Sequence, residues 1–422
     1  MKKLWIFFIL FCIFACSDKS TGEDYPVIDV VNNVGKYQRV YCSDYFSSIE
    51  LIPLETSEDC LLEKVASTAH DNKNIIVNED YILMTTRQRG LYAFDHSGKF
   101  LHQIGNRGQG PNEYLRLFNV FLNTNETTIF IEDSRKILEY NLRGNFIRSF
   151  QNPNVEDNIV NRCSYVEDNV FVGQINISSG KCKCRYFLFN GKGETIKCFP
   201  NYTFFERNGF SYSNFDGALL PIRVDDRIYL KDYVNDTIYS LENLTLQPAY
   251  ILGLGKYTFP KECLEISISN GGQSPTSKAL TIFSMMGSAN YFFYIINVPD
   301  FFPRPKTKTL YLPLRGEYTL ENRVFGIYSI AENKNILLDT DDYYQTGIIN
   351  DMNGGLPFFP RYYAGDNVVV DVWYADDMKE MLTEEYFAKQ TVKDHEAHKK
   401  LRELMKNLKE DDNPVVVVAK LK

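Results

Sequence analysis

A short phrase that returns about every fifty residues constrains the fold of this chain more than any other feature. Each copy places an aromatic residue before a turn that contains Gly or Asn, and a second apolar stretch follows the turn. The copies occupy residues 94–101, 140–147, 189–196 and, in a weaker form, 239–246. Their leading aromatic residues are 46, 49 and 50 residues apart, and self-similarity at such a period is typical of stacked or radial repeat folds.

Each copy predicts a β-hairpin, because alternating apolar residues flank a turn in which Gly supplies the positive φ and Asp or Asn caps the backbone. A further strand is predicted before each hairpin, at residues 81–84, 128–131, 169–172 and 227–230. With a shorter inner strand added, each period holds about four strands, which is one blade of a β-propeller. A meandering β-sandwich would explain the alternation but not the period, so we expect the propeller.

The composition agrees with one large all-β domain. The chain has 422 residues, of which 44% are hydrophobic and 14% aromatic, and its 28 Tyr and 30 Phe suit half-buried strand surfaces. No linker rich in Pro, Gly or Ser divides the body of the sequence. We therefore expect a single domain over residues 27–422.

The N-terminus predicts export and a lipid anchor. Lys2 and Lys3 precede a short apolar run, so residues 1–15 are typical of a secretory signal and too short to span a bilayer. Ala15 followed by Cys16 and a polar segment resembles a bacterial lipobox, in which the cysteine is acylated after cleavage. We expect lipid attachment at Cys16, a flexible tether over residues 16–26, and a place at the bacterial cell envelope, on the outer membrane.

The charge excludes one class of partner. The chain carries a formal charge of −8, and removal of residues 1–15, which hold two lysines and no acid, makes it −10. Nucleic-acid binding needs a basic footprint, so no nucleic-acid partner is expected. An acidic body is also not drawn to anionic lipid heads, so the predicted membrane partner is reached through the lipid alone.

Three segments between the repeats carry a family resemblance. Residues 52–56 (Ile-Pro-Leu-Glu-Thr), the Gly-rich phrase 104–114 and residues 412–415 (Asp-Asn-Pro-Val) resemble the six-bladed β-propeller lipoprotein family, which is similar to NHL-type propellers. The resemblance covers nearly all of the chain after the signal. It implies six blades and a lipid-anchored, exported context, and it implies no reaction and no catalytic residues.

The last third of the chain predicts two more blades and a helical insertion. Residues 290–294 and 312–318 are assigned to blade five, and residues 325–328 and 367–373 to blade six. Between residues 376 and 408 the apolar residues fall at helical spacing, so one or two amphipathic helices are expected there. The final segment, 415–419, predicts a strand that closes the ring, with residues 27–30 as its expected partner.

Seven cysteines remain after Cys12 and Cys16 are set aside, so at least one is unpaired or bonds between molecules. Export permits disulfides, and Cys42–Cys60 and Cys182–Cys198 are two possible pairs. Buried, unpaired cysteines in strands are the alternative. Cys182 and Cys184 place two thiols on one face of a strand, but no second pair of ligands accompanies them, so no zinc site is predicted.

The search for catalytic chemistry gives no catalytic residue, metal site or cofactor. His395-Glu396-Ala397-His398 is one residue short of the spacing that places two histidines on zinc, and its Lys-rich surroundings favour a solvated helix face. The Gly-rich phrase lacks the Lys-Ser/Thr ending of a phosphate loop. Its loop nevertheless offers polar side chains beside an aromatic ring at a blade junction, where propellers carry function. The candidate binding residues are Arg107, Gln109, Glu113 and Tyr114, and hydrogen bonding between blades is the alternative role for the three polar residues.

These features favour a lipid-anchored envelope propeller that acts as a binding or interaction module. Its ligand is expected to be a glycan, a peptide or a protein. One alternative is an enzyme, a hydrolase or lyase, that uses the central channel, although scattered histidines weaken this hypothesis. The other is a scaffold that docks a partner through its C-terminal helices.

Overall fold

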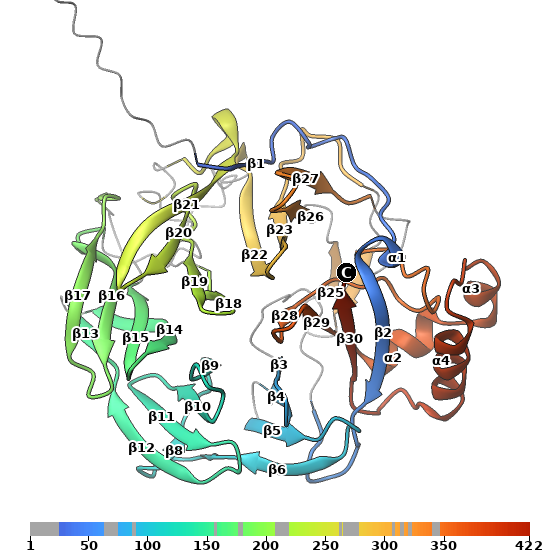
Figure 1. Ribbon diagram of the computed structural model, residues 1–422, viewed down its shortest axis with the longest axis horizontal. Coiled ribbons are helices and arrows are strands. Elements are labelled where there is room, and N and C mark those ends of the chain that lie inside the picture. The colour runs from blue at the N-terminus through green and yellow to red at the C-terminus, as the bar shows by residue number, and fades with distance from the viewer. Residues whose placement is uncertain are drawn as a thin grey trace, which may run out of the picture.

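Six sheets of four or five strands stand like blades around a central channel in the computed structural model of the protein (Figure 1). The structure describes residues 25–62, 75–86, 90–155, 158–175, 180–206, 219–260, 264, 278–305, 309–312, 316–319, 323–339 and 347–422. The predicted all-β, six-bladed propeller is confirmed. The predicted signal segment, Cys16 and most of the tether lie outside the described residues.

Blades one to three follow one another along the chain, and each is built from the channel outward. Blade one consists of β3 (Ile75–Val77), β4 (Ile82–Thr86), β5 (Gly90–Phe94) and β6 (Phe100–Ile104). Blade two consists of β9 (Asn119–Leu122), β10 (Thr128–Glu132), β11 (Lys136–Asn141) and β12 (Phe146–Gln151). Blade three consists of β14 (Asn158–Glu167), β15 (Val170–Ile175), β16 (Cys184–Asn190) and β17 (Thr195–Pro200). Three short strands lie beside them: β7 (Asn106–Arg107), β8 (Glu113–Tyr114) and β13 (Asn154–Val155).

Blades four to six draw on both ends of the chain. Blade four consists of β18 (Ile222–Val224), β19 (Arg227–Leu230), β20 (Thr237–Glu242), β21 (Thr245–Gly253) and β1 (Val27–Asp29). Blade five consists of β22 (Thr281–Gly287), β23 (Tyr291–Asn297), β26 (Arg323–Ser329) and β27 (Lys334–Leu337). Blade six consists of β28 (Tyr362–Tyr363), β29 (Val368–Trp373), β30 (Val415–Leu421) and β2 (Phe46–Pro53). A separate hairpin, β24 (Thr309–Leu312) with β25 (Gly316–Thr319), is inserted between β23 and β26.

The two faces of the propeller differ. The four main strands of each blade run antiparallel to their neighbours, so the turn after the first strand and the turn after the third lie at the same end of the channel. We call this end the turn face. The opposite end, the loop face, carries the connections between blades and those between the second and third strands, including residues 254–260 and 298–305.

The repeated phrase forms the hairpin between the third and fourth strands of blades one to four, as predicted. In blade one, Asp95 Oδ1 accepts hydrogen bonds from the backbone N–H of Ser97 (2.8 Å) and Lys99 (3.0 Å). Asn141 and Asn190 make the equivalent pair of bonds in blades two and three. Gly98 has φ +86°, and in the weaker fourth copy Asn243, with φ +47°, takes a left-handed conformation instead.

Hydrophobic clusters fill the space between each pair of neighbouring blades. Successive residues of a strand point to opposite faces of its sheet. In β9, Val120 and Leu122 pack toward blade one, while Phe121 packs toward blade three. Phe121 stacks on Phe130 at 5.3 Å between ring centroids, and Phe130 meets Phe171 of blade three edge-on at 5.1 Å. Both faces of a blade are therefore core.

The two ends of the chain share blade six, but the predicted partner of the closing strand was wrong. β30 pairs with β29 on one side and antiparallel with β2 on the other, with Ile49 opposite Ala419. Residues 27–29 form β1, which pairs parallel with β21 at the outer edge of blade four. Both N-terminal segments contain the apolar residues of a strand, and ring closure requires the one that reaches blade six.

An N-terminal strap, residues 30–45, joins β1 to β2 across blade five (Figure 1). Gln38 forms a parallel bridge with Leu338, and Tyr41 forms one with Ile349. A short helix, α1 (Cys42–Tyr45), leads into β2. The strap therefore connects blades four, five and six along the outside of the ring.

The assignment of residues 325–328 to blade six was also wrong. They lie in β26, the third strand of blade five, opposite residues 292–295 of β23. The inserted β24–β25 hairpin separates β23 from β26 in the sequence, so β26 resembled the start of a new blade. Residues 368–373 belong to blade six as β29, as predicted.

The predicted helical insertion connects β29 to β30 and packs outside blade six (Figure 1). It consists of α2 (Ala375–Met381), α3 (Glu384–Ala388) and α4 (His395–Asn407). The 3-10 turn η1 (Gly255–Tyr257) follows β21. Among the described residues, no helix combines the length and apolar character needed to cross a membrane.

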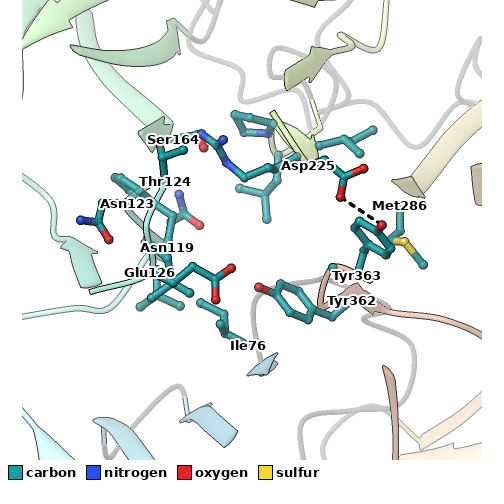
Figure 2. A pocket seen from close by; sticks show the side chains of 18 of the residues that line it. Ile76, Asn119, Asn123, Thr124, Glu126, Ser164, Asp225, Met286, Tyr362 and Tyr363 are labelled. Carbon is teal, nitrogen blue, oxygen red and sulfur yellow. Dashed lines mark hydrogen bonds between the residues drawn. The ribbon is translucent and has the colours of Figure 1, made fainter. Parts of the chain in front are cut away.

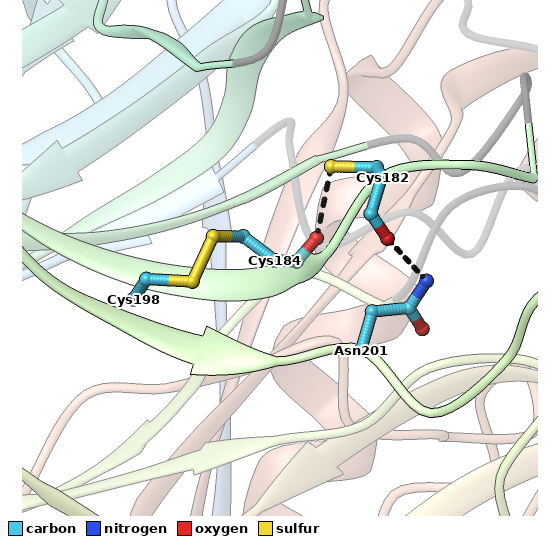
Figure 3. The surroundings of a disulfide bond; sticks show 4 residues. All are labelled: Cys182, Cys184, Cys198 and Asn201. Carbon is cyan, nitrogen blue, oxygen red and sulfur yellow. Dashed lines mark hydrogen bonds between the residues drawn. A yellow bond between two sulfur atoms is a disulfide. The ribbon is translucent and has the colours of Figure 1, made fainter.

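One disulfide, Cys184–Cys198, joins β16 to β17 across 14 residues (Figure 3). Of the two pairs considered from the sequence, Cys182–Cys198 misplaced one partner by two residues. The Cys182 thiol donates instead to the carbonyl of Cys184 at 3.2 Å. The pair Cys42–Cys60 was wrong, since both cysteines are buried as free thiols.

Candidate functional site

A cavity of about 280 Å³ lies where the inner strands meet (Figure 2). Every blade contributes to its wall, through Ile76, Asn119, Ser164, Arg223, Met286 and Tyr362 in blades one to six. Residues from the first turns of blades two, four and six also line it, so the cavity lies toward the turn face. A concave site of this size with several convergent polar groups suits a small ligand.

Three ionisable side chains from alternate blades meet in this cavity. Glu126 follows β9, Arg223 lies in β18, and Tyr362 lies in β28. The Glu126 carboxylate and the Tyr362 hydroxyl point toward one another (Figure 2). Arg223 donates from Nη2 to the backbone carbonyl of Tyr165 in blade three, which fixes its guanidinium at the wall.

The cavity shifts the pKa values of these three groups. Burial raises the pKa of Glu126; Arg223 lowers it, Glu79 raises it, and the net direction is upward. Burial lowers the pKa of Arg223, against the opposing effects of Tyr362, Asp226 and Glu126. Burial and then Glu126 raise the pKa of Tyr362, while Arg223 lowers it. Ionisable groups that shift one another in a shared cavity are a common property of functional sites.

The wall opposite Glu126 adds the Tyr363 hydroxyl and two further carboxylates. Tyr363 donates from its hydroxyl to Asp225 Oδ1 at 3.1 Å (Figure 2). Burial and then Asp225 raise the pKa of this tyrosine. Together with Glu126, the two acids Asp225 and Asp226 outnumber the single cation Arg223 in the lining. The cavity is therefore net acidic.

A buried ion pair holds β28, the strand that presents both tyrosines. Arg361 Nε contacts Asp371 Oδ1 of β29 at 2.5 Å, and both side chains are about nine-tenths buried. The Asp371 carboxylate also accepts hydrogen bonds from the backbone N–H of Phe359 (3.1 Å) and Val372 (2.8 Å). Burial lowers the pKa of Arg361, whereas Asp371, Tyr374 and Asp377 raise it; the net direction is upward, so the guanidinium stays charged.

A buried carboxylate shapes the wall on the side of blade three. Glu132 of β10 is 1% exposed and accepts hydrogen bonds from the backbone N–H of Arg162 and Cys163, both at 2.9 Å. Arg162 has φ +52°, and the register of β14 shifts between Asn161 and Ser164. Glu132 thus stabilises a bulge that places Cys163 and Ser164 in the lining of the cavity.

The candidate binding residues predicted from the sequence lie elsewhere, on the loop between blades one and two. Arg107 and Gln109 are exposed there. Glu113 accepts a hydrogen bond from Gly110 N–H at 2.8 Å, and Tyr114, 2% exposed, packs between the two blades. The Glu113 contact lies within the loop itself, and Tyr114 belongs to the core between the two blades. Binding by this loop stays a prediction.

The site that the structure brings together was not found from the sequence. Glu126, Arg223 and Tyr362 are about a hundred or more residues apart and belong to no motif. The sequence feature that these three residues share is their position, since each lies in or just after the first strand of a blade. Among the described residues, no group of three or more His, Cys, Asp or Glu side chains is arranged to hold a metal ion. The enzyme and scaffold hypotheses stay predictions.

Comparisons with known proteins give one matching family model and several solved structures that this chain resembles. A family model described as "Domain of unknown function (DUF4934)" matches residues 25–420. A solved protein described as exported, from Bacteroides fragilis NCTC 9343, is 17% identical with a TM-score of 0.63, over 94% of this chain and 99% of that chain. A member of the DUF4221 family from Bacteroides vulgatus is 11% identical with a TM-score of 0.44, over 89% and 97% of the two chains. No curated protein sequence matches this chain.

Proposed function

The chain belongs to the DUF4934 family, and from that premise we propose that it is an exported, lipid-anchored propeller whose channel cavity binds a small polar ligand. The observation that carries the proposal is the convergence of Glu126, Arg223 and Tyr362 from three alternate blades on one cavity. Core packing needs apolar side chains between the blades, and it does not require charged groups on the channel wall.

The lining indicates the chemistry of the ligand. Carboxylates and tyrosine hydroxyls bind hydroxyl and amine groups, while aromatic rings suit the apolar faces of sugars. The net negative charge of the cavity disfavours anions and favours a ligand that carries an ammonium group. An amino sugar combines these properties at a size that such a cavity can hold.

Three matched monosaccharides test this proposal by titration calorimetry. Glucosamine, N-acetylglucosamine and glucose share a ring and differ in carrying an ammonium, an amide or a hydroxyl group. We expect glucosamine to bind the most tightly, and Glu126→Gln to weaken its binding by about tenfold or more, which corresponds to about 1.4 kcal/mol. Binding of glucose should change little, because it carries no charge to pair with Glu126.

The pH dependence provides a second readout. Protonation of Glu126 removes the charge that attracts the ammonium group, so affinity for glucosamine should fall as the pH falls. Because the pKa of Glu126 is raised, this loss should begin above the pH expected for an ordinary glutamate, whose pKa is about 4.3. Glu167→Gln, which changes an exposed acid at the end of the first strand of blade three and outside the cavity, is the matched control. Absence of binding by all three sugars, or equal binding by Glu126→Gln, would contradict the proposed site.

The lipid anchor is the second part of the proposal, and its support is the N-terminal sequence. Lys2, Lys3 and the apolar run precede Ala15 and Cys16, in the order of a lipoprotein signal. Residues 17–24 separate this cysteine from the first described residue, Tyr25, at the outer edge of blade four. More than one acyl chain gives stable attachment, whereas a single chain gives marginal binding.

Cys16→Ser should transfer the protein from the detergent phase to the aqueous phase, or block its processing. Phase partitioning with a nonionic detergent measures the change. Cys12→Ser is the control, because Phe11 before it is too bulky for a cleavage site, and this variant should partition as the unaltered chain does. Unchanged membrane partitioning of Cys16→Ser would rule out the anchor.

A further inference from the structure

We propose that an aromatic and basic surface beside the start of the fold rests on the lipid headgroups of the membrane that anchors the chain. This surface, the rim patch, consists of Lys36, Lys256, Tyr257, Phe301 and Phe302. The inference builds on the lipid anchor and is independent of the channel ligand. It assigns the orientation of the propeller on the membrane, with the loop face of blades four and five toward the lipid.

The aromatic part of the rim patch is a cluster of three rings on two loops. Tyr257 lies 4.8 Å from Phe302 and 5.6 Å from Phe301 between ring centroids, and the two phenylalanines are 4.7 Å apart. Phe301 is 56% exposed, although a ring of this size is ordinarily covered. Tyrosine is enriched at the boundary between lipid and water, and phenylalanine is among the residues that membrane-surface segments bury at the headgroup boundary.

The N-terminal strap supports this cluster from one side. The Tyr37 hydroxyl donates to the carbonyl of Pro303 at 2.5 Å, and the backbone of Gly35 lies against the ring of Pro303. Lys36, which is exposed, lies between these two contacts. On the other loop, the Lys256 ammonium lies 5.3 Å from the centre of the Tyr257 ring. Both lysines thus flank the aromatic rings.

Charge distinguishes the rim patch from the rest of the molecule. Its two lysines are exposed, and the adjacent Arg304 is paired with Asp300 at 3.1 Å. The patch is therefore positive, on a body whose charge after removal of residues 1–15 is −10. A basic residue near an anionic lipid surface contributes about 1 kcal/mol, and long side chains can extend their charges to the headgroups.

The path of the chain places the predicted anchor near the rim patch. Val27 of β1 pairs with Ile251, close to the end of β21 at the loop face, and β21 leads directly into Tyr257. Cys16 precedes Tyr25 by nine residues, which span at most about 30 Å. An acylated Cys16 therefore holds this part of the rim within about 30 Å of the bilayer surface.

Tryptophan fluorescence with brominated lipids tests the orientation. The chain has two native tryptophans, Trp5 in the segment removed with the signal and Trp373, which is fully buried. Phe301→Trp places a reporter in the rim patch. Phe146→Trp is the matched control, because Phe146 is an exposed phenylalanine (37%) at the turn face of blade two. The processed chains are reconstituted into vesicles of brominated phosphatidylethanolamine and phosphatidylglycerol.

We expect Phe301→Trp to lose emission to the brominated lipids and to shift its emission to shorter wavelength, while Phe146→Trp keeps both. If the chain is membrane-bound and neither reporter is quenched, the proposed orientation on the membrane is wrong, although the lipid anchor is correct. The rim patch would then contact a protein. If the unaltered chain does not sediment with vesicles, the anchor is wrong. In that case Phe301→Trp must still be quenched at high vesicle concentration, and failure to do so overturns the rim patch as well.

Discussion

A chain that ends at Asn413 is expected not to fold. Deletion of residues 414–422 removes β30, which lies between β29 and β2 and is the link that closes the ring. Val415, Val416 and Val417 are fully buried, and burial of each stabilises the fold by about 1.5–3 kcal/mol. Their sum is comparable to the total stability of a typical domain, about 5–15 kcal/mol. We therefore expect aggregated protein without a cooperative thermal transition.

Circular dichroism melting and size-exclusion chromatography measure this outcome. Lys420→Ala is the matched control within the same strand, because Lys420 is exposed and its substitution should change stability by less than about 0.5 kcal/mol. A soluble, truncated chain with an unchanged melting temperature would show that β30 is peripheral to the fold.

Arg361→Met is expected to destabilise the protein by about 3–5 kcal/mol, because it leaves the Asp371 carboxylate buried without its cation. The substitution should also weaken glucosamine binding, since Arg361 directly precedes the two tyrosines of the cavity. Urea denaturation gives the stability, and titration calorimetry gives the affinity.

Two controls separate the buried ion pair from general effects of the substitution. Arg402→Met removes the ion-pair partner of the exposed Glu384 and should cause a much smaller loss of stability. The double variant Arg361→Met/Asp371→Leu replaces both buried charges by apolar groups and should regain much of the stability. Equal losses for Arg361→Met and Arg402→Met would contradict a special role of the buried pair.

Local patterns in the sequence were sufficient to predict the hairpins, and the hairpins were sufficient to predict the blades. Asp95, Asn141 and Asn190 each accept two backbone hydrogen bonds within their own turn, so residue type and turn geometry are determined within five residues. The period then follows from the repetition of these turns. The helical insertion was predictable for a similar reason, since the spacing of apolar residues along one helix is also local.

Pairings between distant segments were not predictable in this way. The segments that became β1 and β2 both contain the apolar residues of a strand, and only the closed ring decides which one reaches β30. The inserted hairpin β24–β25 shifted the expected position of blade six, because an insertion changes the period without changing the strands around it.

The channel site was the least predictable feature. Glu126, Arg223 and Tyr362 come together because the blades are arranged radially, and a radial arrangement has no counterpart in linear spacing. Arg107 and Gln109 were predicted because a Gly-rich loop is recognisable in a sequence. The ends of the short inner strands and their turns have no recognisable sequence pattern, although they point to the channel axis.

The shared sixth blade also has a consequence for the order of events during synthesis. Ser47 of β2 hydrogen-bonds to Lys420 of β30 across 373 residues of chain. A polypeptide emerges N-terminus first, so β2 waits without its partner until the last residues are made, and pairing over such a separation is slow. For the exported protein proposed above, this delay keeps the chain open during translation. An open chain is the form that can thread through a secretion channel, and the ring then closes on the far side of the membrane.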